Sequence, residues 1–95
     1  MPTIADLEKP IQQAADAIKA LGASEVYVFG SAAAGMLHEY SDVDLAISGL
    51  PPAMFFKAMG QASDIIGRPV DMVDLDEDTL FVAYLKRKGM LRRVS

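Results

Sequence analysis

Residues 26–45 read VYVFGSAAAGMLHEYSDVDL, and this stretch decides the fold. Four β-branched or aromatic residues open it, the Gly30-Ser31 pair follows, and a second apolar run enters through Asp-Val-Asp at its end. Apolar runs bounded by glycine and serine are typical of strands, and the three alanines between them favour a short helix. We therefore expect a strand over 25–29, a turn with a short helix, and a strand over 42–48.

Two carboxylates stand together at the start of the second strand. Side chains alternate between the faces of a strand, so Asp42 and Asp44 share one face while Val43 and Leu45 turn into a core. Adjacent carboxylates repel each other, and a shared cation relieves that repulsion. Mg²⁺ prefers oxygen ligands and usually keeps waters and a substrate phosphate among them. The pair therefore predicts a magnesium site.

The Gly-Ser pair at the end of the first strand predicts an anion site. Gly30 lets the backbone approach a ligand closely, and Ser31 opens the expected short helix, whose unpaired N–H groups favour a phosphate. The two strands would bring this phosphate site beside the magnesium site.

A third strand, expected over 69–75, carries two further acids. Val70 and Met72 belong on its core face, which puts Asp71 on the opposite face and Asp74 on the apolar one. Asp71 is therefore the better third carboxylate, and the alternative is that it is only a solvent-exposed strand residue.

Helices are expected around these strands. Apolar residues at steps of three and four predict helices over about 4–21, 52–66 and 77–88. Pro10 predicts a kink or a later start in the first of them. Asp76 is a good N-cap for the last one. The side chains of that last helix expected to point inward are Leu80, Phe81, Tyr84 and Leu85.

The order of these elements predicts an α/β (α+β) fold with a small mixed β-sheet of about three to four strands. Helices should cover one face of the sheet and leave the other open for the site. With 95 residues, 52% of them hydrophobic, the chain can build one small core, so we expect a single domain over 1–95.

The composition excludes several classes of site. Without cysteine there are neither disulfides nor thiolate metal sites, and the single histidine, His38, cannot make a zinc site unaided. No apolar run is long enough for a membrane span and the N-terminus lacks the layout of a signal peptide, so we expect a cytoplasmic protein.

The charge is unevenly distributed along the chain. Residues 1–85 hold thirteen acids and four bases, a net charge of −9, whereas residues 86–95 carry five bases and no acid. An acidic body argues against direct binding of nucleic acid. The basic tail either complements a helix C-terminus or contacts a triphosphate or an acidic partner.

The pattern of Gly-Ser, ten residues and Asp-x-Asp resembles the signature of the DNA polymerase β-type nucleotidyltransferase superfamily. At this length the chain is most similar to the minimal nucleotidyltransferases. The resemblance implies that Asp42, Asp44 and Asp71 are catalytic and hold Mg²⁺, with two ions expected. It also implies that Gly30 and Ser31 bind the β- and γ-phosphates of ATP.

The same resemblance implies a partner. Minimal nucleotidyltransferases are typically paired with a small helical HEPN protein, an RNase toxin, which they neutralise as antitoxins by transferring AMP to a tyrosine hydroxyl. The short chain has no room for an acceptor domain, so a protein partner fits better than the small-molecule acceptor of the aminoglycoside-modifying relatives. Both homo-oligomers and complexes with the partner stay open.

The chain departs from the family directly after Gly-Ser. Minimal nucleotidyltransferases commonly carry an arginine there, whereas this chain has Ala32, Ala33 and Ala34. Either the basic tail or a partner supplies the phosphate-binding charge, or the protein is a catalytically silent antitoxin that masks its partner by contact alone.

Overall fold

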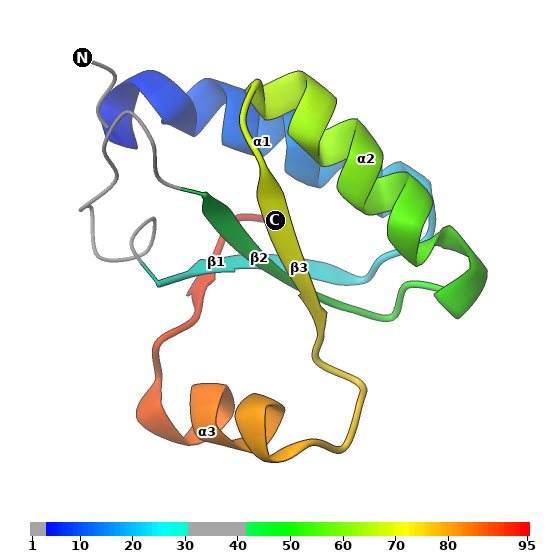
Figure 1. The fold of residues 1–95 in the computed structure, drawn as a ribbon, viewed down its shortest axis with the longest axis vertical. Helices are drawn as coiled ribbons and strands as arrows, with labels where there is room; N and C mark the ends of the chain where they lie inside the picture. Colours follow the sequence, from blue (N-terminus) through cyan, green and yellow to red (C-terminus); the bar gives the residue numbers. More distant parts are fainter. Residues whose placement is uncertain (1–3, 31–41) are drawn as a thin grey trace.

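The fold is a four-stranded mixed sheet with strand order β3-β2-β1-β4, seen in a computed structural model that describes residues 4–30 and 42–95 (Figure 1). The central pair β1 and β2 is antiparallel, β4 joins β1 antiparallel, and β3 joins β2 in parallel. The elements in chain order are α1 (Ile4–Ala20), β1 (Glu25–Phe29), β2 (Val43–Ser48), the 3-10 helix η1 (Pro52–Met54), α2 (Phe55–Ile66), β3 (Val70–Asp74), α3 (Leu80–Lys88) and β4 (Arg92–Arg93). The predicted small mixed sheet of an α+β fold is confirmed.

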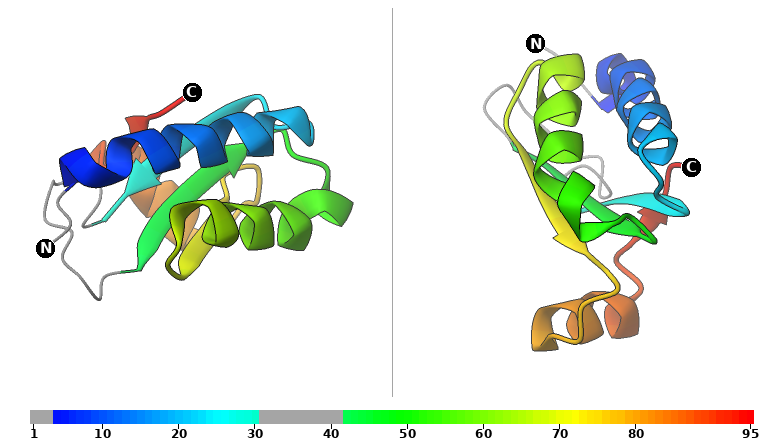
Figure 2. Two further views of the ribbon diagram at one scale, coloured as in Figure 1. Left: turned by 90° about the horizontal axis from the view of Figure 1, so that it is seen from above. Right: turned by 90° about the vertical axis from the view of Figure 1, so that its right-hand side faces the viewer.

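The main core lies between α1, α2 and one face of the sheet. The two helices lie side by side over that face (Figure 2). Alternate residues of β1 and β2 point into this layer, as their spacing predicted. Pro10 lies inside α1 without ending it, so one continuous helix covers most of the predicted range. The largest fully buried side chains are Ile18, Leu45, Ile47, Val26, Val28 and Val43.

The opposite face of the sheet is only partly open, because α3 lies against it (Figure 2). The predicted cover of one face by helices thus holds for α1 and α2, and α3 adds a second, smaller apolar layer. This layer exists because β1 and β2 also carry apolar residues on that face, and burying them stabilises the fold. Its buried members are Phe29, Ala46, Leu75, Val82 and Leu85.

The last helix differs from its prediction in start and orientation. It begins three residues late, at Leu80, because Thr79 is the N-cap and its hydroxyl accepts a hydrogen bond from the backbone N–H of Val82. Leu85 is buried as predicted, but the other buried residue is Val82, while Leu80, Phe81 and Tyr84 are exposed. The expectation that these three point inward was wrong.

The chain ends on the edge of the sheet. The short strand β4 pairs with Tyr27 and Val28, and the backbone of Val26 bonds to both Val94 and Ser95. Among the helices of the described residues, none is long and apolar enough to cross a membrane.

Candidate functional site

Three strands bring the predicted acids to one end of the sheet. In the antiparallel pair, Asp44 lies opposite Phe29 at the end of β1, and in the parallel pair it lies opposite Asp71 at the start of β3. Residues paired across neighbouring strands point to the same face, so the carboxylates of Asp44 and Asp71 share the face that α3 partly covers. Asp42 is exposed and comes just before β2. Asp74 lies at the other end of β3 and accepts a hydrogen bond from the backbone N–H of Asp76.

Gly30 is placed against this group by the turn that ends β1. Its φ is +65°, a left-handed conformation that glycine adopts without strain. A Cβ atom at this position would lie 2.5 Å from Oδ2 of Asp44. Glycine is therefore needed here for both its backbone angle and its lack of a side chain, and the Asp44 carboxylate packs directly over the turn.

Asp44 is the electrostatic centre of the group. Partial burial raises the pKa of its carboxyl above the ordinary 3.8, and the negative charges of Asp71 and, to a smaller extent, Asp42 raise it further. The three acids are thus close enough to repel one another. This repulsion is unfavourable in the free protein. A cation bound between the carboxylates would attract each of them and outweigh the repulsion.

The donor set suits a hard cation. Three carboxylates offer only oxygen ligands, which Mg²⁺ prefers. The negative charge of Asp44 lies close to the negative charges of Asp71 and Asp42. Within 4–30 and 42–95, however, no group of three or more histidine or acidic side chains is arranged so that it could hold a metal ion. A Mg²⁺ ion held by carboxylates usually keeps water and phosphate oxygens among its ligands.

The other half of the predicted phosphate site lies outside the described residues. Ser31 and the three alanines that follow it belong to the undescribed segment 31–41. Only Gly30 therefore places the predicted phosphate site relative to the carboxylates.

The basic tail divides between two places in the fold. Arg93 pairs with Tyr27 on β1, and its positive charge acts on the Tyr27 hydroxyl. Lys86 lies in the last turn of α3 and lowers the pKa of the Asp76 carboxyl, although two hydrogen bonds to Asp76 have larger effects. Neither base lies at the end of the sheet that carries Asp44.

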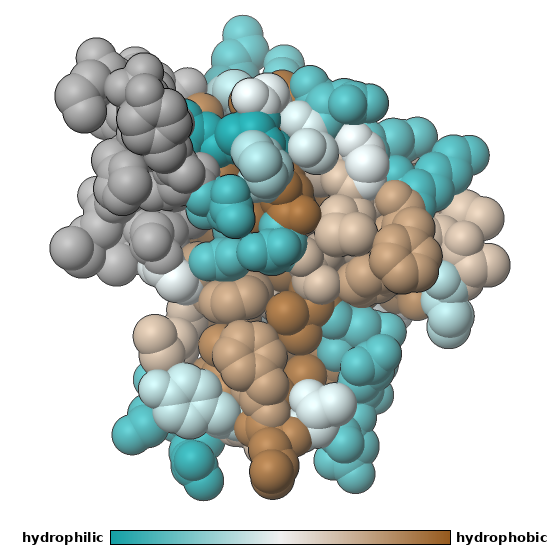
Figure 3. Space-filling view, in the orientation of Figure 1, coloured by the Kyte–Doolittle hydropathy of each residue, from teal (hydrophilic) through white to brown (hydrophobic). Residues whose placement is uncertain are grey.

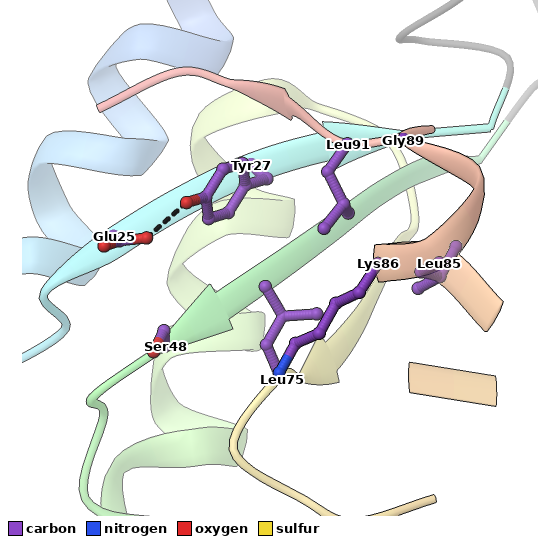
Figure 4. Close-up of a pocket in the computed structure, with 8 residues that line it drawn as sticks. All are labelled: Glu25, Tyr27, Ser48, Leu75, Leu85, Lys86, Gly89 and Leu91. Carbon is purple, nitrogen blue, oxygen red and sulfur yellow. Dashed lines mark hydrogen bonds between the residues drawn. The ribbon is translucent and has the colours of Figure 1, made fainter. Parts of the chain in front are cut away.

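A pocket of about 300 Å³ opens between α3 and the far end of the sheet (Figure 4). Tyr27 and Leu91 line it from the sheet side, and Lys86 from the helix. The Tyr27 hydroxyl donates to the Glu25 carboxylate, and this bond is the main cause of the raised pKa of Tyr27. Sequence reasoning missed this pocket because its walls come from the packing of α3, which periodicity did not predict. Because the Glu25 carboxylate in this pocket already accepts the hydrogen bond of the Tyr27 hydroxyl, the pocket does not resemble a reaction centre.

Solved structures share this fold. A structure provisionally described as a minimal nucleotidyltransferase superposes with a TM-score of 0.76 at 22% identity, covering 90% of this chain and 92% of that one. A toxin–antitoxin structure with AMP-PNP superposes with a TM-score of 0.71 at 20% identity, covering 93% and 72%. A complex of a tri-AMPylated Shewanella oneidensis HEPN toxin with an MNT antitoxin gives 0.57 at 21% identity, covering 88% and 71%.

The family is decided by sequence. No curated protein matches the chain significantly. The family model described as polymerase beta, nucleotidyltransferase, however, matches residues 11–91, which include β1, β2 and β3 with the three acids. The chain belongs to the polymerase β nucleotidyltransferase family.

Proposed function

We propose that this protein transfers AMP from ATP to a tyrosine hydroxyl of a HEPN-type RNase toxin and is the antitoxin of that toxin. Family membership supports nucleotidyl transfer in general. Two of the similar structures support a protein acceptor, since one is a toxin–antitoxin complex with AMP-PNP and another contains an AMPylated HEPN toxin. In this proposal residues 1–95 form one nucleotidyltransferase domain, and the reaction takes place in the cytoplasm.

The observation that carries the proposal is the grouping of carboxylates around Asp44. Asp42 comes just before the strand that carries Asp44, and Asp71 lies opposite Asp44 on the neighbouring strand. Beyond the effect of partial burial, the charges of Asp71 and Asp42 raise the pKa of Asp44, which supports a shared carboxylate site.

The roles of the acids follow from this arrangement. Asp42 and Asp44 would hold Mg²⁺ beside the triphosphate, and Asp71 would complete the ligand set. Bound there, Mg²⁺ neutralises charge on the attacked phosphate and on the leaving group.

The transfer itself breaks one bond and forms one. The tyrosine oxygen attacks the α-phosphorus, the bond to the bridging oxygen breaks, and pyrophosphate leaves with the electron pair. Asp71 would receive the proton of the hydroxyl.

The phosphates of ATP would be held at the end of β1. Gly30 presents backbone close to the Asp44 carboxylate without a side chain in the way. Ser31 would add its hydroxyl and N–H group to the β- and γ-phosphates.

A second candidate is an antitoxin that masks its partner by contact alone. The sequence favours it at one place, Ala32, where the minimal nucleotidyltransferases commonly have arginine. Of the basic residues of the tail, Lys86 lies on α3 beside the pocket at the far end of the sheet and Arg93 pairs with Tyr27, so neither of these two supplies that charge at the carboxylates.

The test is intact-protein mass spectrometry of the protein encoded by the neighbouring gene, incubated with this protein, ATP and Mg²⁺. We expect a mass gain of whole AMP units with the wild type. The double variant Asp42→Asn with Asp44→Asn should give no gain, because it removes two of the three carboxylates. It should still fold, since it removes a carboxylate whose partial burial first, and whose repulsion by Asp71 and Asp42 second, raise its pKa.

A matched control distinguishes the loss of the carboxylates at this site from the loss of two negative charges as such. Asp16→Asn with Asp64→Asn removes the same charge from exposed positions on α1 and α2 and should transfer AMP normally. Unchanged transfer by the Asp42/Asp44 variant would refute the catalytic assignment. A stable complex with no mass gain in any version would establish the contact antitoxin.

A further inference from the structure

Helix α3 exposes aromatic and aliphatic side chains that its own packing does not use. Leu80 is 92% exposed, Phe81 49% and Tyr84 41%, while Val82 and Leu85 make the contacts with the sheet. Burying such side chains releases free energy, so their exposure in a protein this small points to an occupant.

Phe81 differs from the other two in what it touches. Its ring meets the ring of Phe29 edge to face, with 6.0 Å between centroids and 64° between planes. Phe29 is buried and lies directly opposite Asp44 in the sheet. Phe81 is therefore one side-chain contact away from the strand position that carries the central carboxylate.

The two features face the same way. In Figure 3 a band of hydrophobic atoms, with hydrophilic atoms on either side, runs over α3 and continues to the sheet, where hydrophilic atoms begin beside the starts of β2 and β3. A molecule held by its phosphates at the carboxylates can reach the aromatic ring without leaving this face. Phe29 fixes one edge of the Phe81 ring and leaves half of the side chain to solvent.

We propose that the exposed side of Phe81 stacks on the base of the bound nucleotide; this inference rests on the proposed function and assigns the base to a place on α3. A nucleotide has one charged end and one flat aromatic end, and this face offers carboxylates for a cation-bound triphosphate at one place and an aromatic ring beside it. Stacking on an aromatic ring accepts any base, because every base has a π-face. The site would therefore recognise the size of the ring system more than its hydrogen-bonding edge.

The chain contains a matched control. Phe56 is 76% exposed on α2 and also meets a second ring edge to face, that of Phe55. It lines a surface hollow with Asp74, the last residue of β3, and Glu77, which comes after it, whereas Asp71 lies near the start of β3. Phe56 thus shares the chemistry and exposure of Phe81 but not its neighbourhood.

The experiment is calorimetric titration with two probes, ATP and inorganic tripolyphosphate, each with Mg²⁺, on the wild type, Phe81→Leu and Phe56→Leu. Phe81→Leu should weaken ATP about tenfold and leave tripolyphosphate unchanged, because it removes a stacking ring and no phosphate contact. Phe56→Leu should change neither. Phe81→Trp, which keeps an aromatic face, should bind ATP at least as well as the wild type.

Three results would overturn the inference. Equal ATP affinity in Phe81→Leu and wild type would mean that Phe81 does not stack on the base. If that variant also lost binding of the HEPN-type partner, the exposed side chains of α3 would be a protein contact. Equal weakening of ATP and tripolyphosphate would mean that Phe81 only supports the carboxylates. A wild type that binds neither probe would refute the proposed function together with the inference.

Discussion

At the scale of single residues, the site is governed by the fit between Gly30 and Asp44. The turn needs a positive φ, and the space where a side chain would begin is filled by the Asp44 carboxylate. The two requirements are independent, because a residue that tolerated the positive φ would still displace the Asp44 carboxylate with its side chain. The chain offers a second glycine, Gly67 at the end of α2, with a φ of +80° and nothing within 4 Å of its missing Cβ.

The two glycines allow backbone strain and carboxylate displacement to be measured apart. Gly30→Ala and Gly67→Ala should each lower the free energy of unfolding by about 1 kcal/mol, measured in urea, because alanine is strained in this conformation. Only Gly30→Ala should also abolish AMP transfer, since its methyl group must move Asp44. Equal activity of the two variants would show that the position of the Asp44 carboxylate is not critical.

At the scale of elements, the connection from β3 to α3 is tied to the end of β2 by one carboxylate. Asp76 accepts hydrogen bonds from the backbone N–H of Gly49 at 2.6 Å and from the hydroxyl of Ser48 at 2.8 Å. These bonds, the one from Gly49 first, lower the pKa of the Asp76 carboxyl below its ordinary 3.8. The tie fixes where the chain leaves the sheet, and so where α3 can lie.

This tie predicts a pH dependence of stability. A carboxyl with a lowered pKa stabilises the fold above its unfolded pKa, and that stabilisation is lost as the pH falls through the lower folded value. Asp76→Asn should therefore be less stable than the wild type at pH 7 and lose less stability between pH 5 and pH 3, measured by urea unfolding. Asp78→Asn, an exposed neighbour, should keep the wild-type pH dependence.

The same elements show what local sequence rules could not predict. Asp76 was predicted to cap α3, but its carboxylate accepts a hydrogen bond from Gly49, just after β2. Rules based on residues nearby in the sequence do not predict a partner this distant along the chain. Residues 80–85 are apolar on all sides of the helix, so periodicity did not select the buried face, and contact with the sheet did. Nor do Arg92 and Arg93 resemble a strand, since they form β4 only because β1 offers a free edge.

At the scale of the whole molecule, two apolar layers of unequal size lie on either side of one sheet. The layer under α1 and α2 contains most of the buried side chains, whereas α3 contributes only Val82 and Leu85 to the other. Local opening requires less free energy where fewer apolar contacts are broken. The layer with α3 should therefore be the first to open.

Amide hydrogen exchange measures this order directly. Backbone amides of α3 should exchange faster than those of β2, because α3 can leave the sheet while the main core stays closed. Adding ATP with Mg²⁺ should slow exchange in α3 if Phe81 holds the base. Uniform protection of both elements would instead mean that the two layers unfold as one unit.

Much of this architecture could be predicted from the sequence. Alternation placed β1, β2 and β3 to within one residue at each end and put Asp71, not Asp74, on the face of Asp44. This worked because each strand has one face in the main core, which fixes the direction of every second side chain. The relation of Phe81 to Phe29 was out of reach, because it joins elements more than 50 residues apart through a helix whose orientation the sequence did not encode locally.

The smaller layer has a consequence for how this protein can diverge. The carboxylates belong to strands anchored by the main core, whereas the exposed face of α3 supports almost no packing. Substitutions at Leu80 or Tyr84 therefore cost the fold little, a substitution at Phe81 costs its contact with Phe29, and all three leave the acids in place. The side chains of α3 can therefore vary during evolution while the three acids stay the same. Relatives that keep these acids are expected to differ most along this helix.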